Sequence, residues 1–413
     1  MKNYLLLLIT LLAFSLTSCH EEEEPVVAKE WPESNHTLLI YMIGDNNLSE
    51  WCEANTEACI KGLLHTETPI NLVIYEDGRS TMMGEGKKGA PALFRLKRNY
   101  ENKEKIDTIM IRTFSADQNS ADPIVLQEIV NEAFEAYPAT IKGLELWSHG
   151  LGWAPSPNYK SRAIGNAETR ATQFIGQDGD NYMEIWKLRE ALEKCPHLDY
   201  ISFDACNMAQ AEVAYELRNV ADYMLACPTE ILIAGLPYDV MMEILSEIKT
   251  KEDISTEFPN LIDAFGFLSN FSGGGTISFL NLKEMDSLLQ AYKNLLAVCS
   301  DRVELLSQHT YTYEDYIQEF GRGSMGSAYL FYDMKDYADF LVNYQTENNP
   351  DYDRLIDAIN KVVISEYHSA RFLDFSDIRC CGLGVGIPEV FRNITLNRNT
   401  LWSAYQELQW CKD

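Results

Sequence analysis

His149 and Cys206 are the two residues whose types and positions best suit covalent catalysis. Each lies within three residues of the end of a short, mostly apolar run, residues 144–147 for the histidine and 200–203 for the cysteine. A free thiol with a pKa of about 8.5 is only slightly ionised at neutral pH, so an adjacent imidazole is needed to take its proton and later to protonate the leaving group. Cys206 as nucleophile and His149 as base would therefore form a complete dyad.

The position of both residues at the end of an expected strand is what would bring them together. In open α/β sheets, ligands bind at the carboxyl ends of the strands. If the two strands are neighbours, the side chains face each other although they lie far apart in sequence. Gly150 adds to this site because a residue without Cβ permits close backbone approach, and its N–H with that of Cys206 can form an oxyanion hole.

Each motif also has a plain structural explanation. A cysteine that ends an apolar strand is more often a core residue, and a histidine followed by glycine is common. The catalytic interpretation depends on the two motifs occurring together at strand ends.

The sequence around these motifs alternates between strand and helix patterns. Helices are expected from about residue 49 and at 123–137, 184–194 and 208–220. Strands are expected at 38–43, 70–75, 93–96, 108–114, 144–147, 200–203 and 223–227. This order predicts an α/β fold with a mainly parallel central sheet covered by helices on both faces. Strands 93–96 and 108–114 are expected to form a hairpin because the connection between them is charged.

Two further regions have less regular patterns. Residues 151–183 are rich in Gly, Pro, Asn and Asp and are expected to form a long loop, which in a compact domain is usually functional. Beyond residue 246 we expect helices at 283–298 and 351–366, with short strands at 276–280 and 382–387, the second returning to the main sheet. The predicted organisation is a catalytic core at 36–245 and an α+β, mainly helical C-terminal region at 246–413.

Three segments, residues 36–48, 144–153 and 201–217, resemble the clostripain family of caspase-fold cysteine peptidases. The resemblance covers residues 36–235 well, and the His-to-Cys separation is similar to the roughly 50 residues of caspases. It implies a caspase-like sandwich and hydrolysis of peptide bonds through a thioester intermediate without a cofactor. It also implies that His149 and Cys206 are the catalytic pair.

The resemblance further assigns Asp204 as an acid that holds a basic side chain in the primary specificity pocket. A preference for Arg or Lys before the scissile bond follows. Asp204 as a strand-end residue that only accepts backbone hydrogen bonds stays an alternative. The chain departs from the family at residues 228–238, where relatives carry Glu-Pro, glycines and a tryptophan. This segment is largely apolar, with Glu230 as the candidate second acid, and it argues against a strict requirement for Arg.

Relatives are often activated by cleavage in the long loop after the histidine motif. Lys160, Arg162 and Arg170 are candidate cleavage sites in this loop by residue type.

Composition and missing motifs narrow the range of partners. The 34 Lys and Arg residues face 62 Asp and Glu, a formal net charge of −28, which repels nucleic acid. A peptide or protein substrate is the expected partner. No HExxH, CxxC pair, P-loop or dinucleotide motif occurs, so neither a metal nor a cofactor is expected. Residues 177–181 are rich in oxygen ligands but lack the spacing of a calcium loop, and a polar turn is expected there.

The N-terminus predicts export and lipid anchoring. Lys2 precedes an apolar run at 4–14 that is too short to span a bilayer comfortably, and the run leads to Leu16-Thr17-Ser18-Cys19. This segment resembles the bacterial lipobox, which implies a signal peptide at 1–18 and lipidation of Cys19. The acidic run at 21–24 starts a tether at 19–35 that resembles the export signal of Bacteroides-type surface lipoproteins. The expected location is the outer membrane, exposed at the cell surface.

The remaining cysteines show no dense disulfide framework, and small buried hydrophobes are the default interpretation. The function that we predict is a cysteine endopeptidase with a Cys206–His149 dyad. The competing hypothesis is a catalytically inert surface lipoprotein that binds a partner and keeps the caspase-like fold.

Overall fold

Five parallel strands form the centre of the main sheet of the protein. The computed structural model describes residues 34–78, 90–99, 101–153, 174–299, 301–302, 317–322, 329–373 and 375–386. The central strands are, in spatial order, β9 (Ala221–Ala226), β8 (Leu198–Asp204), β5 (Ile141–Trp147), β1 (His36–Ile43) and β2 (Asn71–Asp77). Every residue of β1, β2 and β8 is buried, as expected for strands covered on both faces.

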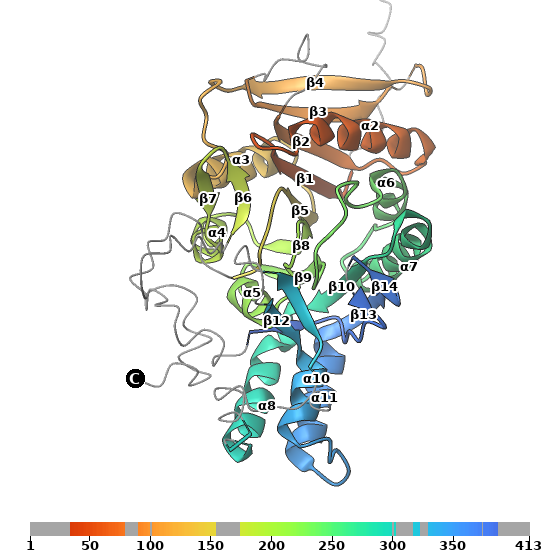
Figure 1. Cartoon of the computed structure of the whole chain (residues 1–413). Coiled ribbons are helices and arrows are strands. Elements are labelled where there is room, and N and C mark those ends of the chain that lie inside the picture. Colours follow the sequence, from red (N-terminus) through yellow and green to blue (C-terminus); the bar gives the residue numbers. More distant parts are fainter. Residues whose placement is uncertain are drawn as a thin grey trace, which may run out of the picture. The chain divides into compact units, whose positions relative to one another are not determined.

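Antiparallel strands close both edges of this sheet, which has nine described strands (Figure 1). At one edge, β3 (Ala92–Arg98) and β4 (Ile106–Thr113) form the predicted hairpin. At the other, β10 (Thr276–Asn281) pairs with β9, and β13 (Val363–His368) pairs with β10.

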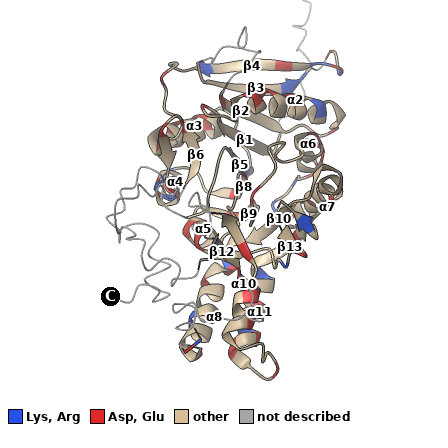
Figure 2. Ribbon diagram, in the orientation of Figure 1, with Lys and Arg blue, Asp and Glu red and all other residues tan. Residues whose placement is uncertain are grey.

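Helices cover both faces. One face packs against α2 (Ser49–His65), α6 (Tyr238–Ser246) and α7 (Ile254–Ser272). The other carries α3 (Pro123–Ala136), α4 (Ile185–Leu192), α5 (Ala211–Leu217), α8 (Met285–Val298), α10 (Met334–Leu341) and α11 (Pro350–Val362). The predicted α/β sandwich with a mainly parallel centre is therefore confirmed. Acidic positions recur along α10 and α11 (Figure 2).

Short elements complete the described chain. The hairpin β6 (Ile175–Asp178) and β7 (Asn181–Met183) lies within the segment expected to be a loop. A second sheet contains β11 (Glu319–Arg322), β12 (Tyr329–Asp333) and β16 (Gly384–Val385), and β14 (Arg371–Phe372) pairs with β15 (Phe375–Ser376). A 3-10 turn, η1 (Leu282–Glu284), joins β10 to α8. No described helix combines the length and apolar content needed to cross a bilayer.

Two expectations for the C-terminal region were wrong in detail. The strand predicted at 382–387 belongs to the small sheet rather than to the main one. The helix predicted at 351–366 ends at Val362, and residues 363–366 are part of β13 instead. Val363 and Ile364 are β-branched and favour extended backbone, and the free edge of β10 supplies the hydrogen-bonding partner.

Candidate active site

The strands that carry the two motifs are direct neighbours in the sheet. β5 pairs with β8 in parallel, with Trp147 opposite Asp204. The N–H of Ser148 then donates to the carbonyl of Asp204 at 3.3 Å, so the register continues past the end of both strands. His149 and Cys206 each lie two residues beyond this pair. The two motifs therefore lie at the carboxyl ends of adjacent parallel strands.

Gly150 packs directly against the turn that carries Cys206. A Cβ at this position would lie 2.9 Å from the Cys206 carbonyl oxygen and 2.9 Å from the Ala205 Cβ, so no other residue fits without displacement. Gly150 also forms an isolated bridge to Ile175, and in that bridge the hydrogen bonds are made by the flanking residues. The N–H of Gly150 is therefore not taken up by β6 and can serve as a donor.

His149 is held by polar groups from β6 and from the loop that follows β1. Its backbone carbonyl accepts from the N–H of Gly176 at 2.9 Å. Its Nε2 lies 2.7 Å from the Oδ1 of Asn47, in the loop that follows β1. Because a carbonyl oxygen only accepts, this contact places the ring proton on Nε2 and leaves Nδ1 as the basic nitrogen. Burial lowers the pKa of His149, which keeps the ring neutral and able to act as a base at pH 7.

The thiol of Cys206 makes its described contacts with the backbone of Ile231. The N–H of Ile231 donates to the sulfur at 3.4 Å, and the sulfur lies 3.9 Å from the Ile231 carbonyl oxygen. Burial raises the pKa of the Cys206 thiol to about 11. The N–H of Ile231 opposes this rise, and the negative charges of Glu230 and Asp204 add to it. Among the described residues, the thiol and the imidazole therefore have different hydrogen-bond partners.

Asp204 is almost fully buried under the loop that leads to α6. Its Oδ2 accepts from the N–H of Leu236 at 3.1 Å and lies 2.9 Å from the hydroxyl oxygen of Tyr238. Gly235 passes so close that a Cβ there would be 2.2 Å from the same oxygen. Burial raises the pKa of Asp204 to about 6, against the effect of these two donors. Asp204 therefore accepts a backbone hydrogen bond, as in the alternative expectation, and also contacts a side chain.

Glu230 lies near Cys206 and raises the pKa of its thiol. Its Oε2 is buried and has no hydrogen-bond partner among the described residues. A buried carboxylate oxygen without a donor is costly, and a cationic side chain would satisfy it.

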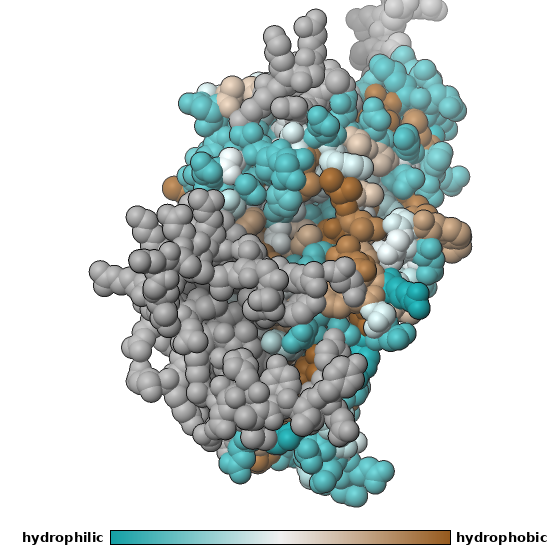
Figure 3. Space-filling view, in the orientation of Figure 1, coloured by the Kyte–Doolittle hydropathy of each residue, from teal (hydrophilic) through white to brown (hydrophobic). Residues whose placement is uncertain are grey.

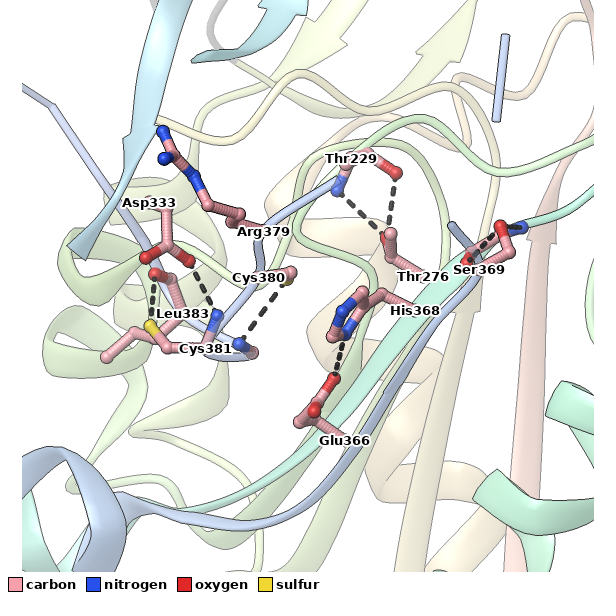
Figure 4. Close-up of polar contacts among 12 residues, drawn as sticks. Thr229, Thr276, Asp333, Glu366, His368, Ser369, Arg379, Cys380, Cys381 and Leu383 are labelled. Atoms are coloured by element: carbon pink, nitrogen blue, oxygen red, sulfur yellow. Dashed lines mark hydrogen bonds and ion pairs between the residues drawn. The ribbon is translucent and has the colours of Figure 1, made fainter. Parts of the chain in front are cut away.

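The segment at 228–237, here called the pocket loop, is otherwise apolar and partly exposed. Ile233 is 52% exposed, and Ile231 and Leu232 are partly exposed. Hydrophobic surface gathers over the connection between β9 and α6 (Figure 3). At its start, Thr229 is fixed to Thr276 of β10 through their hydroxyls, 2.7 Å apart (Figure 4).

Several other predictions can be placed on the structure. Residues 178–181 form the turn between β6 and β7, as expected for a polar turn. The eight described cysteines are all free, and three of them, Cys52, Cys59 and Cys227, are buried. Cys19 and the candidate cleavage sites Lys160, Arg162 and Arg170 lie outside the described residues.

Sequence reasoning missed two residues that contact the predicted site residues. No role was predicted for Asn47, whose side chain contacts the ring of His149. The rule applied to β5 and β8, that chemistry gathers at strand ends, applies equally to Asn47 after β1. Tyr238 gave no such signal, because its place beside Asp204 depends on the path of the pocket loop.

A family model and several solved structures match this chain. The model of the clostripain family of C11 peptidases matches residues 40–413. Comparison with curated proteins gave no match. Among solved structures, an inactive zymogen of a C11 protease from Parabacteroides distasonis is 29% identical, with a TM-score of 0.70, and the match covers 92% of this chain and 98% of that one.

Two structures from Bacteroides thetaiotaomicron are also similar. A secreted C11 cysteine protease in complex with an irreversible peptide inhibitor is 25% identical, with a TM-score of 0.68 and coverage of 92% of this chain and 100% of that one. A second secreted C11 cysteine protease is 18% identical, with a TM-score of 0.67 and coverage of 90% and 99%, and supports the fold alone. The family match over nearly the whole chain and the α/β fold agree: the chain belongs to the clostripain family and is a cysteine-type peptidase.

Proposed function

We propose that the protein is an endopeptidase in which Cys206 is the nucleophile and His149 the base. The observation that supports this most directly is the register of β5 and β8, which places both residues two positions beyond a paired Trp147 and Asp204. The neutral imidazole, with its proton held on Nε2 by Asn47, has Nδ1 free to accept the thiol proton.

The chemistry follows from these groups. As Nδ1 takes the proton, the sulfur attacks the scissile carbonyl carbon and a C–S bond forms. The N–H groups of Gly150 and Cys206 stabilise the oxyanion, a contribution of about 3 kcal/mol per donor. The imidazolium then protonates the leaving amine, the C–N bond breaks, and a thioester remains. Water, deprotonated by the same imidazole, hydrolyses the thioester and restores the thiol.

We further propose that Glu230 and Asp204 favour Arg or Lys before the scissile bond. Glu230 has a buried oxygen without a described donor, so a substrate cation would complete its hydrogen bonding. Asp204 already accepts from Leu236 and meets Tyr238, so its contribution is a negative potential rather than a free acceptor. The apolar pocket loop does not supply further charge, so we expect a preference and not an absolute requirement.

Labelling with a peptidyl thiol-reactive ketone that carries Lys or Arg at the recognition position tests both proposals. The wild type should be labelled at Cys206, and Cys206→Ala should not be labelled. Glu230→Gln should retain labelling but lose about tenfold of the rate advantage of a basic reagent over its norleucine analogue, because one charge-assisted contact is removed. Equal labelling of wild type and Cys206→Ala would exclude the nucleophile.

The competing proposal is a protein that keeps the fold and binds a partner without cleaving it. The hydrogen bond from the N–H of Ile231 to the sulfur of Cys206 is the observation that favours this proposal. In that case no peptide library would be cleaved and the basic reagent would label Cys206 no faster than iodoacetamide does.

We also propose that the protein is an outer-membrane lipoprotein exposed at the cell surface. The supporting features are the small residues before Cys19 and the acidic run that follows it. Cys19→Ser should abolish incorporation of labelled fatty acid and move the protein out of the membrane fraction. Resistance of the wild type to protease added to intact cells would contradict surface exposure.

A further inference from the structure

Glu145, an acidic residue, lies within the buried part of the sheet, shortly before the strand ends that lead to His149 and Cys206. Glu145 is on β5, is 0% exposed, and lies directly across from Ser202 on β8. The hydroxyl of Ser202 donates to Oε2 of Glu145. Both side chains are on the face of the sheet that α2 and α6 cover, the same face as Asp204, two residues beyond Ser202.

Tyr238, the first residue of α6, connects Glu145 to Asp204. Its hydroxyl oxygen lies 2.9 Å from Oδ2 of Asp204 and 3.4 Å from Oε1 of Glu145. A tyrosine hydroxyl has a single proton, so it can donate to only one of these carboxyl groups at a time. The other carboxyl group must then supply a proton of its own if both contacts are to be hydrogen bonds.

The surroundings decide which carboxyl group keeps its proton. Asp204 accepts from the N–H of Leu236 and lies closer to the Tyr238 hydroxyl than Glu145 does, so the ionised form of Asp204 is the better stabilised of the two. Burial and the charge of Asp204 raise the pKa of Glu145 to about 8. At pH 7 Glu145 is therefore an acid and Asp204 a carboxylate. Glu145 donates to Tyr238, and Tyr238 donates to Asp204.

The polar groups that face Glu145 from the elements packed against it carry no positive charge that would favour its ionised form. They are Ser202, Asp204 and Tyr200 on β8, Tyr238 on α6, Cys59 on α2 and Cys227 just after β9. None of these groups is a cation.

The chain of hydrogen bonds ends in the pocket loop. Asp204 also accepts from the N–H of Leu236, so its position fixes the end of that loop, while Thr276 fixes Thr229 at the start (Figure 4). Between these two points, Ile231 contacts the sulfur of Cys206. Moving Asp204 or Tyr238 would therefore shift the backbone that lies on the nucleophile.

We propose that Glu145 is a positioning residue, a neutral hydrogen-bond donor that directs the proton of Tyr238 to Asp204 and so holds the pocket loop at Cys206. When Glu145 ionises at alkaline pH, it becomes a second acceptor that competes for the Tyr238 proton. Asp204 then loses a donor and the pocket loop loses part of its support. The effect on peptide cleavage rests on the function proposed above, whereas the effect on the loop does not.

Glu145→Gln is the decisive variant because its amide donates at every pH and its carbonyl can still accept from Ser202. The kcat/KM ratio of Glu145→Gln to wild type on a Lys or Arg peptide should be constant below pH 7 and rise about fivefold through pH 8, as the wild type loses one hydrogen bond. Glu145→Leu, which has no donor, should fall about tenfold below Glu145→Gln at pH 7, mainly through KM. A ratio that stays flat from pH 6 to pH 10, or equal activity of the two variants, would overturn the proposal.

Two measurements do not need peptidase activity. Alkylation of Cys206 by iodoacetamide, followed by peptide mass spectrometry, reports how closely the pocket loop covers the sulfur. Glu145→Leu should be alkylated several-fold faster than Glu145→Gln at the same pH. If wild type cleaves no peptide but this difference appears, the proposed function fails and the positioning role stands; if the two variants react alike, the positioning role fails whatever the activity.

The pH dependence of unfolding tests the neutral acid itself. A folded pKa of about 8 against an ordinary value of 4.5 means that wild type loses stability as pH rises between these values, because only the unfolded state ionises there. The difference in unfolding temperature between Glu145→Gln and wild type should therefore increase in favour of the variant from pH 5 to pH 8 and stay constant at higher pH. Glu216→Gln is the matched control, since Glu216 is also buried but is paired with Arg189. The same gain in the control, or none in Glu145→Gln, would contradict a neutral Glu145.

Discussion

The two strand ends at the carboxyl edge of the sheet are built in opposite ways. At the end of β5, His149 is held by polar contacts from Asn47 and the backbone of Gly176, and its ring is neutral. At the end of β8, Cys206 lies under the apolar pocket loop, and its thiol is protonated at neutral pH. The proposed base is thus already oriented, while the sulfur of the proposed nucleophile is hydrogen-bonded to the backbone of a loop. The two members of the proposed dyad therefore differ in their state at neutral pH although their strands are in register.

The largest expected effect on activity comes from removing the proposed base. His149→Ala should lower kcat/KM by about 10³-fold, since general acid–base catalysis by one residue contributes on the order of 10² to 10⁴. Turnover of a basic peptide at pH 7 measures it. A His149→Ala enzyme within tenfold of wild type would show that the β5 end does not carry the base.

Gly150 is where the two strand ends touch, so enlarging it should disturb both. Gly150→Ala places a Cβ 2.9 Å from the Cys206 carbonyl oxygen, and we expect a loss of about 10²-fold in kcat through the oxyanion donor. Gly179→Ala is a control at which an added Cβ meets nothing within 4 Å, although its positive φ adds some strain. Similar losses in both variants would point to general backbone strain instead.

The protonated state of Cys206 can be measured in the absence of substrate. With a thiol pKa of about 11, the rate of Cys206 alkylation by iodoacetamide should rise about 10²-fold from pH 7 to pH 9, in step with the thiolate fraction. Cys195, whose pKa burial also raises to about 11, provides a reference in the same digest. A Cys206 alkylation rate that levels off below pH 8 would mean that the thiol is largely ionised at that pH, in contradiction to the raised pKa.

The smallest effect is expected from the contact that orients the imidazole. Asn47→Ala removes one hydrogen bond to His149 and should lower kcat about fivefold. Asn47→Asp should instead place a carboxylate near the ring, raise the pKa of His149 and shift the acidic limb of the pH–rate profile to higher pH. An unchanged acidic limb in Asn47→Asp would show that residue 47 does not influence the group whose ionisation controls activity.

The sequence predicted the fold and the two strand ends because these depend on local patterns. Buried strands such as β1 are nearly continuous apolar runs, and the proposed catalytic residues lie two positions beyond the last pair of β5 and β8. Asn47 was missed because its contact with His149 joins residues 102 positions apart in the sequence. Glu145 had a signal, a carboxyl residue within the apolar run at 144–147, but its partner Tyr238 lies 93 residues further along the chain. Such a contact follows from the path of the pocket loop, which has no local pattern.

The pairing of β10 with β9 has a consequence for how the chain can be divided. β9 is the last parallel strand of the centre, and β10 covers its outer edge from residues well beyond 245. A fragment that stopped at residue 245 would leave this edge unpaired, a template for association with other chains, and would free Thr229 from Thr276. The region after residue 246 is therefore an integral part of the sheet that carries Cys206, and peptidase chemistry and structural support cannot be assigned to separable halves of this chain.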